Sequence, residues 1–327
     1  MIIYRNNSVD PYFNLASEQY LLDEKNGGIF MLWRNDNAVI IGKNQNAYAE
    51  IDLEYVEKNN IKVVRRLTGG GAVFHDIGNI NYTFIVPESE KATLDFERFT
   101  RPVIKAIEAL GVENVCLSGR NDIMIGEQKI SGNAQTQYNG KTLHHGTLLY
   151  SADLSKLAGA LRVDPEKIKS KGIKSVRNRV GNISEYISEK LDTEEFMSYL
   201  EGYISKETDS DIIEFSDEDM QKIQQLSDSK YSTWEWNFGK SKEFCTEKKK
   251  RYPFGSVAVD LSLENGIIKS VKIFGDFFGL KDVSILEEQL LGLRYEMNEV
   301  RNSIDSVILG ECICGIDIEQ FLELLFS

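Results

Sequence analysis

The stretch from Val63 to Phe84, VVRRLTGGGAVFHDIGNINYTF, constrains the fold of this chain more than any other. Apolar residues on both sides of three consecutive glycines indicate a strand, a glycine turn and a second strand. The triplet 69–71 removes every β-carbon from the turn, so a ligand can lie against bare backbone and its N–H groups. Arg65 and Arg66 precede the turn and can bring guanidinium groups to a phosphate or a carboxylate. A glycine triplet alone is more typical of a plain hairpin with solvated arginines, so the interpretation depends on the other motifs.

The composition is typical of a globular protein, and the chain is long enough for two domains. The chain has 327 residues, and its formal net charge of −13 argues against a general nucleic-acid binder. Between Ser184 and Lys230, 14 acidic residues stand against 4 lysines, which is typical of a solvated face. No apolar run reaches transmembrane length. Residues 1–13 lack the basic start and apolar stretch of a signal peptide, so we expect a cytoplasmic protein. The four cysteines lack a metal-ligand spacing and are expected to be reduced thiols: Cys116, Cys245, Cys312 and Cys314.

Periodicity predicts an α+β fold with mixed, largely antiparallel sheets and flanking helices. Helices are predicted at 11–25, 53–59, 94–110, 194–205 and 217–226. Strands are predicted at 29–33, 38–41, around 115, and at 123–125, 129–135 and 142–150. The Asn139-Gly140 pair is a strong hairpin signal. Further helices are expected at 153–160 and from 164, and the basic stretch 168–183 is expected to be a loop that closes on a charged ligand.

The composition changes at Tyr231, which indicates a second domain. Trp234 and Trp236 would face one side of a strand, and Gly239 with the charged run 247–251 is typical of a linker. A hairpin is predicted at 256–274, followed by a helix at 284–298 opened by a capping box and a last helix at 317–326. We therefore expect a catalytic domain over 1–245 and a small α+β accessory domain over 246–327.

Three histidines and a lysine are the main candidates for chemistry. His75 follows the glycine turn, and His144 and His145 share a predicted strand. Lys129 precedes a strand of small residues, 131–134, which would let backbone approach a substrate. Each feature alone is also compatible with a core histidine or a solvated lysine.

Taken together, these segments resemble the lipoate–protein ligase A family. The segment 65–76, RRLTGGGAVFHD, resembles its arginine–glycine–histidine signature. KISGNAQ (129–135) resembles its lysine motif, HHGTLL (144–149) its histidine motif, and Arg120-Asn121-Asp122 the segment before the lysine. The segments 234–240 and 275–278 resemble the accessory domain of bacterial ligases, so the resemblance extends over the whole chain.

The resemblance implies a biotin/lipoate ligase-like catalytic domain and an ATP-dependent reaction. Such a ligase joins lipoate to ATP, which gives lipoyl-AMP and pyrophosphate, and then transfers the lipoyl group to a lysine of an acceptor domain. Lys129 would act electrostatically as the catalytic residue, and Asp122 is the candidate for Mg²⁺. Residues implied to bind lipoate or the adenylate are Arg66, Gly69, Gly70, Gly71, Phe74, His75, Asn79, Trp33 and His145. The loop 169–179 would cover the adenylate.

The resemblance also implies partners and leaves alternatives open. Expected acceptors are apo lipoyl domains of 2-oxoacid dehydrogenase complexes or the glycine-cleavage H protein, and the protein is expected to be a monomer. One alternative is an ATP-independent lipoyl or octanoyl transferase, which would need a cysteine nucleophile near the motifs. Another is a nucleotide or lipoate sensor that has lost catalysis. Biotin is disfavoured because the glycine motif of biotin ligases differs from this one.

Overall fold

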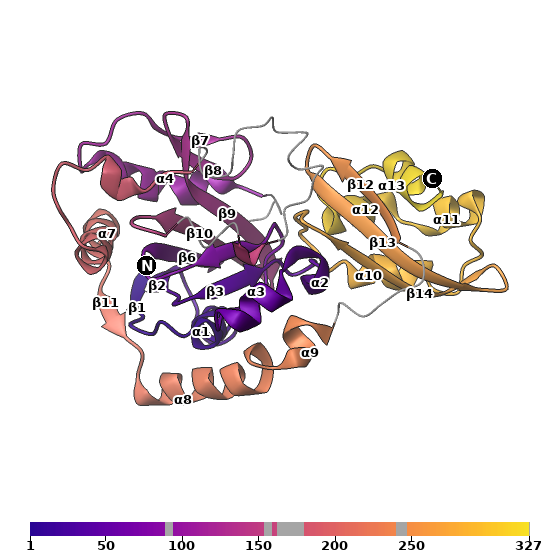
Figure 1. Cartoon of the computed structure of the whole chain (residues 1–327), viewed down its shortest axis with the longest axis horizontal. Helices are drawn as coiled ribbons and strands as arrows, with labels where there is room; N and C mark the ends of the chain where they lie inside the picture. Colours follow the sequence, from indigo (N-terminus) through magenta and orange to yellow (C-terminus); the bar gives the residue numbers. More distant parts are fainter. Residues whose placement is uncertain (89–93, 154–158, 162–179, 240–246, 327) are drawn as a thin grey trace.

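The structure is a computed structural model that describes residues 1–88, 94–153, 159–161, 180–239 and 247–326. Its α+β class is as predicted (Figure 1). The larger part is centred on an eight-stranded sheet with the order β11-β1-β2-β6-β10-β9-β8-β7. β1 runs parallel to β2 and β11, and the other neighbours are antiparallel. The strands are β1 (Ile2–Arg5), β2 (Ile29–Arg34), β6 (Asn79–Pro87), β7 (Val115–Ser118), β8 (Asp122–Ile125), β9 (Gln128–Tyr138), β10 (Lys141–Leu149) and β11 (Ile212–Glu214).

Both faces of this sheet are covered by helices. Along β2, Phe30 and Leu32 enter one core while Met31 and Trp33 enter the other, as the two-residue period of a strand requires. α4 (Phe96–Glu108) and α7 (Thr193–Thr208) cover the first core, and the short 3₁₀-helix η2 (Ile183–Glu185) lies beside it. The second core is covered by α1 (Pro11–Glu24), α8 (Asp217–Leu226) and the π-helical turn η3 (Ser227–Tyr231), on the opposite side in Figure 1.

A second, three-stranded sheet carries the glycine turn. β3 (Ala38–Ile41) lies between β4 (Lys62–Arg65), which is parallel to it, and β5 (Val73–His75), which is antiparallel. The strands before and after the glycines therefore do not pair with each other, and the plain hairpin interpretation is wrong. The turn instead crosses the end of β3. α2 (Ala47–Glu50) and α3 (Leu53–Lys58) cover the outer face of this sheet.

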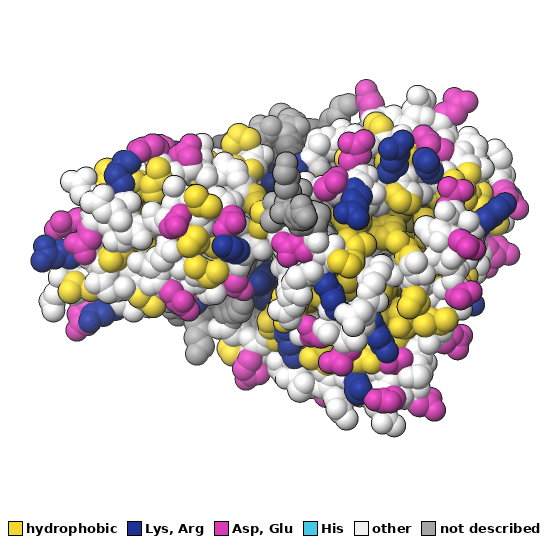
Figure 2. Space-filling view, turned by 180° about the vertical axis from the view of Figure 1, so that it is seen from behind, with side chains coloured by type: hydrophobic (Ala, Val, Ile, Leu, Met, Phe, Trp, Pro, Cys, Tyr) yellow, Lys and Arg dark blue, Asp and Glu magenta, His cyan; other side chains and the backbone are white. Residues whose placement is uncertain are grey.

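Residues 247–326 form a core of their own at one end of the molecule, at the right in Figure 1 and at the left in the reversed view of Figure 2. The predicted hairpin at 256–274 is confirmed, and Asn265 and Gly266 in its turn have φ values of 53° and 76°. The elements are β12 (Glu247–Tyr252), β13 (Gly255–Glu264), β14 (Ile267–Gly275), α10 (Ser284–Leu290), α11 (Met297–Ser303), α12 (Ser306–Cys312) and α13 (Ile318–Phe326).

The strand predicted at Trp234 and Trp236 is wrong. These residues form the short helix α9 (Trp234–Asn237), because the Thr233 hydroxyl accepts the Trp236 N–H and caps the turn. Trp234 is 50% exposed, whereas the Trp236 indole N–H donates to the carbonyl oxygen of Arg65 at 2.8 Å. The two side chains therefore do not share one environment.

Two predictions in the second half of the chain are also wrong. The charged run 247–251 is the edge strand β12 rather than a linker, because charged side chains suit a strand with one unpaired edge. The helix predicted at 284–298 ends at Leu290, and Gly292, with φ at +81°, breaks it before α11. Glu287 does not cap this helix, because its Oε1 accepts the N–H of Ile273.

Several other predictions lie outside the described residues. They include most of the helix at 153–160, the helix from 164, and the loop 169–179. The Asn139-Gly140 hairpin is confirmed, with φ values of 49° and 73°. Among the described residues, no helix combines the length and apolar character needed to cross a bilayer.

Candidate active site

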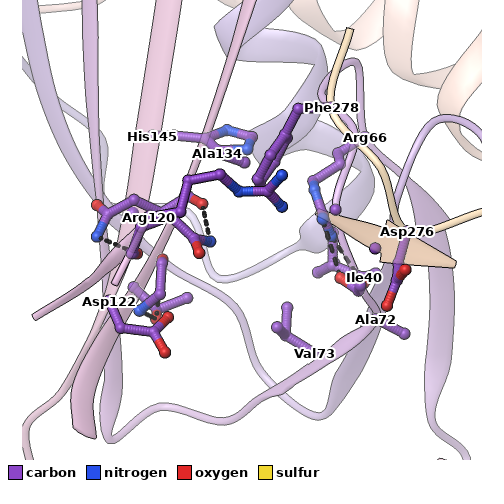
Figure 3. A pocket seen from close by; sticks show the side chains of 18 of the residues that line it. Ile40, Arg66, Ala72, Val73, Arg120, Asp122, Ala134, His145, Asp276 and Phe278 are labelled. Carbon is purple, nitrogen blue, oxygen red and sulfur yellow. Dashed lines mark hydrogen bonds between the residues drawn. The ribbon is translucent and has the colours of Figure 1, made fainter. Parts of the chain in front are cut away.

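The predicted motifs meet around one cavity of about 940 Å³. One wall comes from β9 and β10, a second from the glycine turn and β5, and a third from the C-terminal part at 251–255 and 276–278. In Figure 3, Arg120 and Asp122 face Arg66 and Ile40 across the space, and Phe278 lies between the two sides. The predicted site residues in the wall are Trp33, Arg66, Gly70, Gly71, His75, Asp122, Lys129 and His145.

Three predicted site residues do not line this cavity. Phe74 is buried in the core on the outer face of the three-stranded sheet. Asn79 is 1% exposed and donates to Oδ1 of Asn81, which does line the cavity. Gly69 lies against the C-terminal part instead of the cavity.

The glycine turn is shaped by close backbone contacts. A β-carbon on Gly69 would come within 2.4 Å of the Phe277 carbonyl oxygen, and one on Gly42 within 2.0 Å of the Gly70 carbonyl oxygen. Gly70 has φ at +95°, and its N–H donates to the Phe277 carbonyl at 3.3 Å. A β-carbon on Gly71 would have no neighbour within 4 Å. Gly69 and Gly70 thus permit contact with the C-terminal part, and Gly71 leaves open backbone at the cavity.

The prediction of guanidinium forks for a ligand is wrong for Arg65, whereas Arg66 lines the cavity with most of its donors bonded to the protein. Arg65 is fully buried and donates to five carbonyls, of Gly42, Lys43, Gln45, Trp236 and Asn237. Arg66 lines the cavity, but its guanidinium donates to the carbonyls of Ile40, Gly69 and Gly71 and to the Thr68 hydroxyl. Burial lowers the pKa of each arginine to about 10, which leaves both charged at neutral pH. Their guanidinium groups hold the glycine turn and its neighbouring loop in shape.

Lys129 faces the cavity in an ion pair with Asp122. The distance from Nζ to Oδ1 is 2.7 Å, and both side chains are about one-third exposed. A β-carbon on Gly132 would stand 3.0 Å from this ammonium group, so the missing side chain gives the lysine its room. The small residue on β9 therefore leaves room for the Lys129 side chain at the cavity.

A chain of buried hydrogen bonds runs beneath the cavity. The Trp33 indole N–H donates to the Thr83 hydroxyl at 2.8 Å, which donates to Glu18 at 2.6 Å. Glu18 also accepts from Nδ1 of His145 at 2.9 Å, and Nε2 of His145 meets the Thr68 hydroxyl at 2.8 Å. The Thr68 hydroxyl also accepts from Nε of Arg66, so these hydrogen bonds connect Glu18 to Arg66. The buried carboxylate of Glu18 thus compensates the buried guanidinium charge.

The buried ring of His75 has one nitrogen with no hydrogen-bond partner in the described part of the chain. Its Nδ1 lies 3.1 Å from the Asn35 amide nitrogen, which makes Nδ1 the acceptor and places the proton on Nε2. Nε2 is buried and has no hydrogen-bond partner among the described residues. Burial lowers the pKa of His75 to about 3, with a smaller contribution from the Arg66 charge, so the ring is neutral. His75 therefore contributes to this wall a neutral, buried N–H that no described residue accepts.

Comparisons with known proteins agree with this arrangement. The profile of the lipoyl protein ligase A/B catalytic domain matches residues 10–205, and that of the bacterial lipoate protein ligase C-terminus matches 241–325. The lipoate-protein ligase LplJ of Bacillus subtilis is 43% identical over 331 residues that cover all of both chains. Lipoate–protein ligase 1 of Staphylococcus aureus is 40% identical over 99% of each chain.

This chain belongs to the lipoyl protein ligase A/B family. Among solved structures, Plasmodium falciparum LipL1 in complex with lipoate has a TM-score of 0.78 over 98% of this chain and 97% of its own, at 24% identity, which supports the fold. A lipoate-protein ligase A bound with ATP has a TM-score of 0.61 at 28% identity. A bipartite lipoate protein ligase from Thermoplasma acidophilum, described together with its E2 lipoyl domain, has a TM-score of 0.61 at 30% identity. The last two cover 73% of this chain and 98% and 95% of their own.

In the described part of this lipoyl protein ligase, two carboxylates line the cavity, and most of their capacity is already used by the protein. Asp122 is paired with Lys129, and Oδ1 of Asp276 accepts the N–H of Ser256. In the described part of the chain, no three histidine, cysteine or carboxylate side chains gather into a metal-binding group. This donor set fits a Mg²⁺ that arrives on ATP and keeps phosphate and water ligands, with Asp122 as one contact. It does not fit a metal cage made of protein.

Sequence reasoning missed several residues of this site. Glu18 was not among the predicted site residues, although its spacing of four from Asn14, which is also buried, was a usable signal. Phe278 and Arg251 reach the cavity only because the C-terminal part folds against the glycine turn. No local sequence pattern predicts that contact.

Proposed function

We propose that this chain is an ATP-dependent lipoate–protein ligase that forms lipoyl-AMP and pyrophosphate and then lipoylates a lysine of an acceptor domain. The observation that carries the proposal is that Lys129, the open backbone of Gly71 and the neutral His75 line one cavity. The same cavity has an apolar side of Leu15, Trp33, Ile40 and Val73. An apolar side next to fixed cations and donors suits an alkyl carboxylate held against a phosphate.

The two steps make specific demands on this cavity. In the first, a lipoate carboxylate oxygen attacks the α-phosphorus, the bond between the α-phosphorus and the bridging oxygen breaks, and pyrophosphate leaves with the electron pair. In the second, the acceptor amine attacks the acyl carbon, loses a proton, and AMP leaves. Lys129 acts electrostatically in both: its ammonium group offsets anionic repulsion in the first and stabilises the developing oxyanion in the second.

The ATP-independent transferase is the weaker candidate. Such an enzyme needs a cysteine nucleophile at the acyl carbon. Of the described cysteines, Cys116, Cys312 and Cys314, none lines the cavity, and Cys312 is buried with its pKa raised by burial to about 11. Cys245 lies outside the described residues. The sensor alternative is disfavoured by the cavity position of Lys129.

The finer assignments follow from the same proposal. Mg²⁺ enters with ATP and supplies charge neutralisation of the phosphates. Residues 1–245 and 246–327 act as catalytic and accessory domains, supported by their separate cores and by the two family profiles. An E2 lipoyl domain is the proposed acceptor class, because an archaeal relative is described together with its own E2 lipoyl domain. The monomeric state and the cytoplasmic location stay predictions.

The direct test follows the adenylate. Wild-type protein is incubated with lipoate and α-³²P-labelled ATP, and we expect labelled lipoyl-AMP that disappears when an apo lipoyl domain is added. The Lys129→Ala variant should bind lipoate and ATP but form adenylate at a rate reduced on the order of 100-fold or more. Full-rate lipoyl transfer between carrier proteins without ATP would instead support the transferase.

A further inference from the structure

The cavity concentrates positive charge in an acidic protein. Among the described residues, four cationic side chains line it, Arg66, Arg120, Lys129 and Arg251, against two carboxylates, Asp122 and Asp276. The whole chain carries a formal charge of −13, so this local excess of two positive charges is not a consequence of composition. A cation-lined cleft attracts a polyanion.

Two of these four cations are already engaged by the protein. The guanidinium of Arg66 donates to four acceptors that shape the glycine turn. The ammonium of Lys129 lies 2.7 Å from Asp122. Neither therefore presents an unused fork of N–H donors to the terminal phosphates of a nucleotide.

Arg120 is held in a fixed direction at the cavity. It lies between β7 and β8, and its Nη1 donates to the Phe254 carbonyl at 2.8 Å. Its guanidinium carbon lies 4.2 Å from the centre of the Phe278 ring, and Figure 3 shows the side chain extending toward that ring. Among the described residues Arg120 has no ion-pair partner within 4 Å. The guanidinium N–H groups that do not bond Phe254 can therefore donate to an anionic ligand.

Arg251 reaches the same cavity from the other half of the chain. It lies on β12 opposite Ser256, and its Nη1 donates to the Ser256 hydroxyl at 3.0 Å. No carboxylate of the described residues pairs with it, whereas its neighbour Lys250 is bound to Glu323 at 2.5 Å. Successive side chains of a strand point to opposite faces, so Lys250 turns away while Arg251 lines the cavity.

We propose that Arg120 and Arg251 together bind the β- and γ-phosphates of ATP, which become the pyrophosphate leaving group. Two planar forks, one from each half of the chain, match the several oxygens of a polyphosphate. Because one fork belongs to the C-terminal part, adenylation needs both halves of the chain, whereas transfer from lipoyl-AMP does not use this site. This inference rests on the proposed function.

The test separates the two half-reactions. Adenylate formation from ATP and lipoate is measured for wild type, Arg251→Gln, Arg251→Lys and Arg120→Gln, and lipoyl transfer is measured from supplied lipoyl-AMP to an apo lipoyl domain. Arg251→Gln and Arg120→Gln should each slow adenylation about 100-fold and leave transfer within about 3-fold. Arg251→Lys should recover part of the rate, because charge remains while the fork is lost. Lys250→Gln, which removes one charge from the adjacent position of the same strand, should behave as wild type.

A binding measurement gives a second readout that needs no turnover. Inorganic pyrophosphate is titrated calorimetrically into wild type, Arg251→Gln and Lys250→Gln, and only Arg251→Gln should weaken binding, by about 10-fold or more. Unchanged adenylation in Arg251→Gln, or equal loss of both half-reactions in a folded variant, overturns the inference. A wild-type protein that forms no adenylate overturns the proposed function instead.

Discussion

Glu18 is the buried counter-charge of the site. Its side chain is 3% exposed, and it joins Thr83 and His145 in the chain of hydrogen bonds that ends at Arg66. Arg66 is buried as well and stays charged, so its guanidinium needs a nearby anion. We infer that Glu18 stabilises the folded glycine turn through this network.

Replacing Glu18 by Gln should therefore destabilise the protein strongly. The amide keeps the shape but leaves the Arg66 charge buried without compensation, which we expect to lower the free energy of unfolding by about 3 kcal/mol. The matched control is Glu194→Gln, because Glu194 is 78% exposed and pairs with Arg34 at the surface. The control should change stability by less than about 1 kcal/mol. Urea denaturation of both variants measures the difference, and equal effects would contradict the role given to Glu18.

His144 makes stability depend on pH from within the core. It stacks on Phe99 and Tyr82 with ring centres 4.8 and 6.0 Å apart, and neither ring nitrogen has a hydrogen-bond partner among the described residues. Burial holds the pKa of His144 well below its ordinary value of 6.5. The unfolded chain therefore takes up this proton first as pH falls. The stability that His144 contributes is complete above about pH 6.5 and is lost progressively below it.

The His144→Phe variant should lose part of this acid sensitivity. Between pH 6.5 and pH 5, the slope of unfolding free energy against pH should decrease by an amount that approaches 1.4 kcal/mol per unit, at about one proton per molecule. His75 also has a lowered pKa and remains, so some slope should persist. Denaturation curves at several pH values measure this, and an unchanged slope would show that His144 is not the group that titrates.

At the scale of elements, the glycine turn joins the two halves of the chain. Gly70 donates to the Phe277 carbonyl, and Gly69 leaves no room for a β-carbon beside it. Phe278 then packs with Phe96 and Ala134 of the larger part. The turn therefore has two faces, one bound to the C-terminal part and one open to the cavity.

A Gly69→Ala substitution should separate these two faces. Its β-carbon would meet the Phe277 carbonyl oxygen at 2.4 Å, so backbone must move, and we expect a loss of about 1 to 3 kcal/mol in stability. Gly71→Ala is the matched control, because its β-carbon meets nothing within 4 Å and its φ is not in the left-handed region. That control should stay within about 0.5 kcal/mol of wild type. Similar melting temperatures for both variants would refute the steric argument.

Most elements were predictable because their signals are local. The α1 helix begins where Asp10 caps it, and the 139–140 hairpin forms where Asn and Gly accept positive φ values. The errors occur where tertiary contacts decide. β12 is a strand because β13 pairs with it, and α9 forms where Trp236 docks on Arg65. Arg65 lies 171 residues from Trp236 along the chain. β13 follows β12 directly, but the run of charged residues in β12 concealed this hairpin.

At the scale of the whole molecule, the active cavity belongs to both halves. The resemblance to a family signature predicted that Lys129, His75 and His145 lie in one site. In the structure all three residues line the same cavity. The same motifs did not reveal that Arg65 and Arg66 donate to backbone carbonyls, since those acceptors lie as far away as residues 236 and 237. The C-terminal wall of the cavity could not be predicted either, because it is held by contacts with residues distant in sequence: Asn44, Gly70 and Arg120.

The central claim is that the Lys129 ammonium lies at the acyl–phosphate junction of lipoyl-AMP. The most direct measurement is a crystal structure of the full chain with bound lipoyl-AMP. The account predicts that Nζ of Lys129 lies within hydrogen-bonding distance of that junction, with the alkyl chain beside Trp33 and Val73. An adenylate bound in the cavity with its junction out of reach of Lys129 would contradict it.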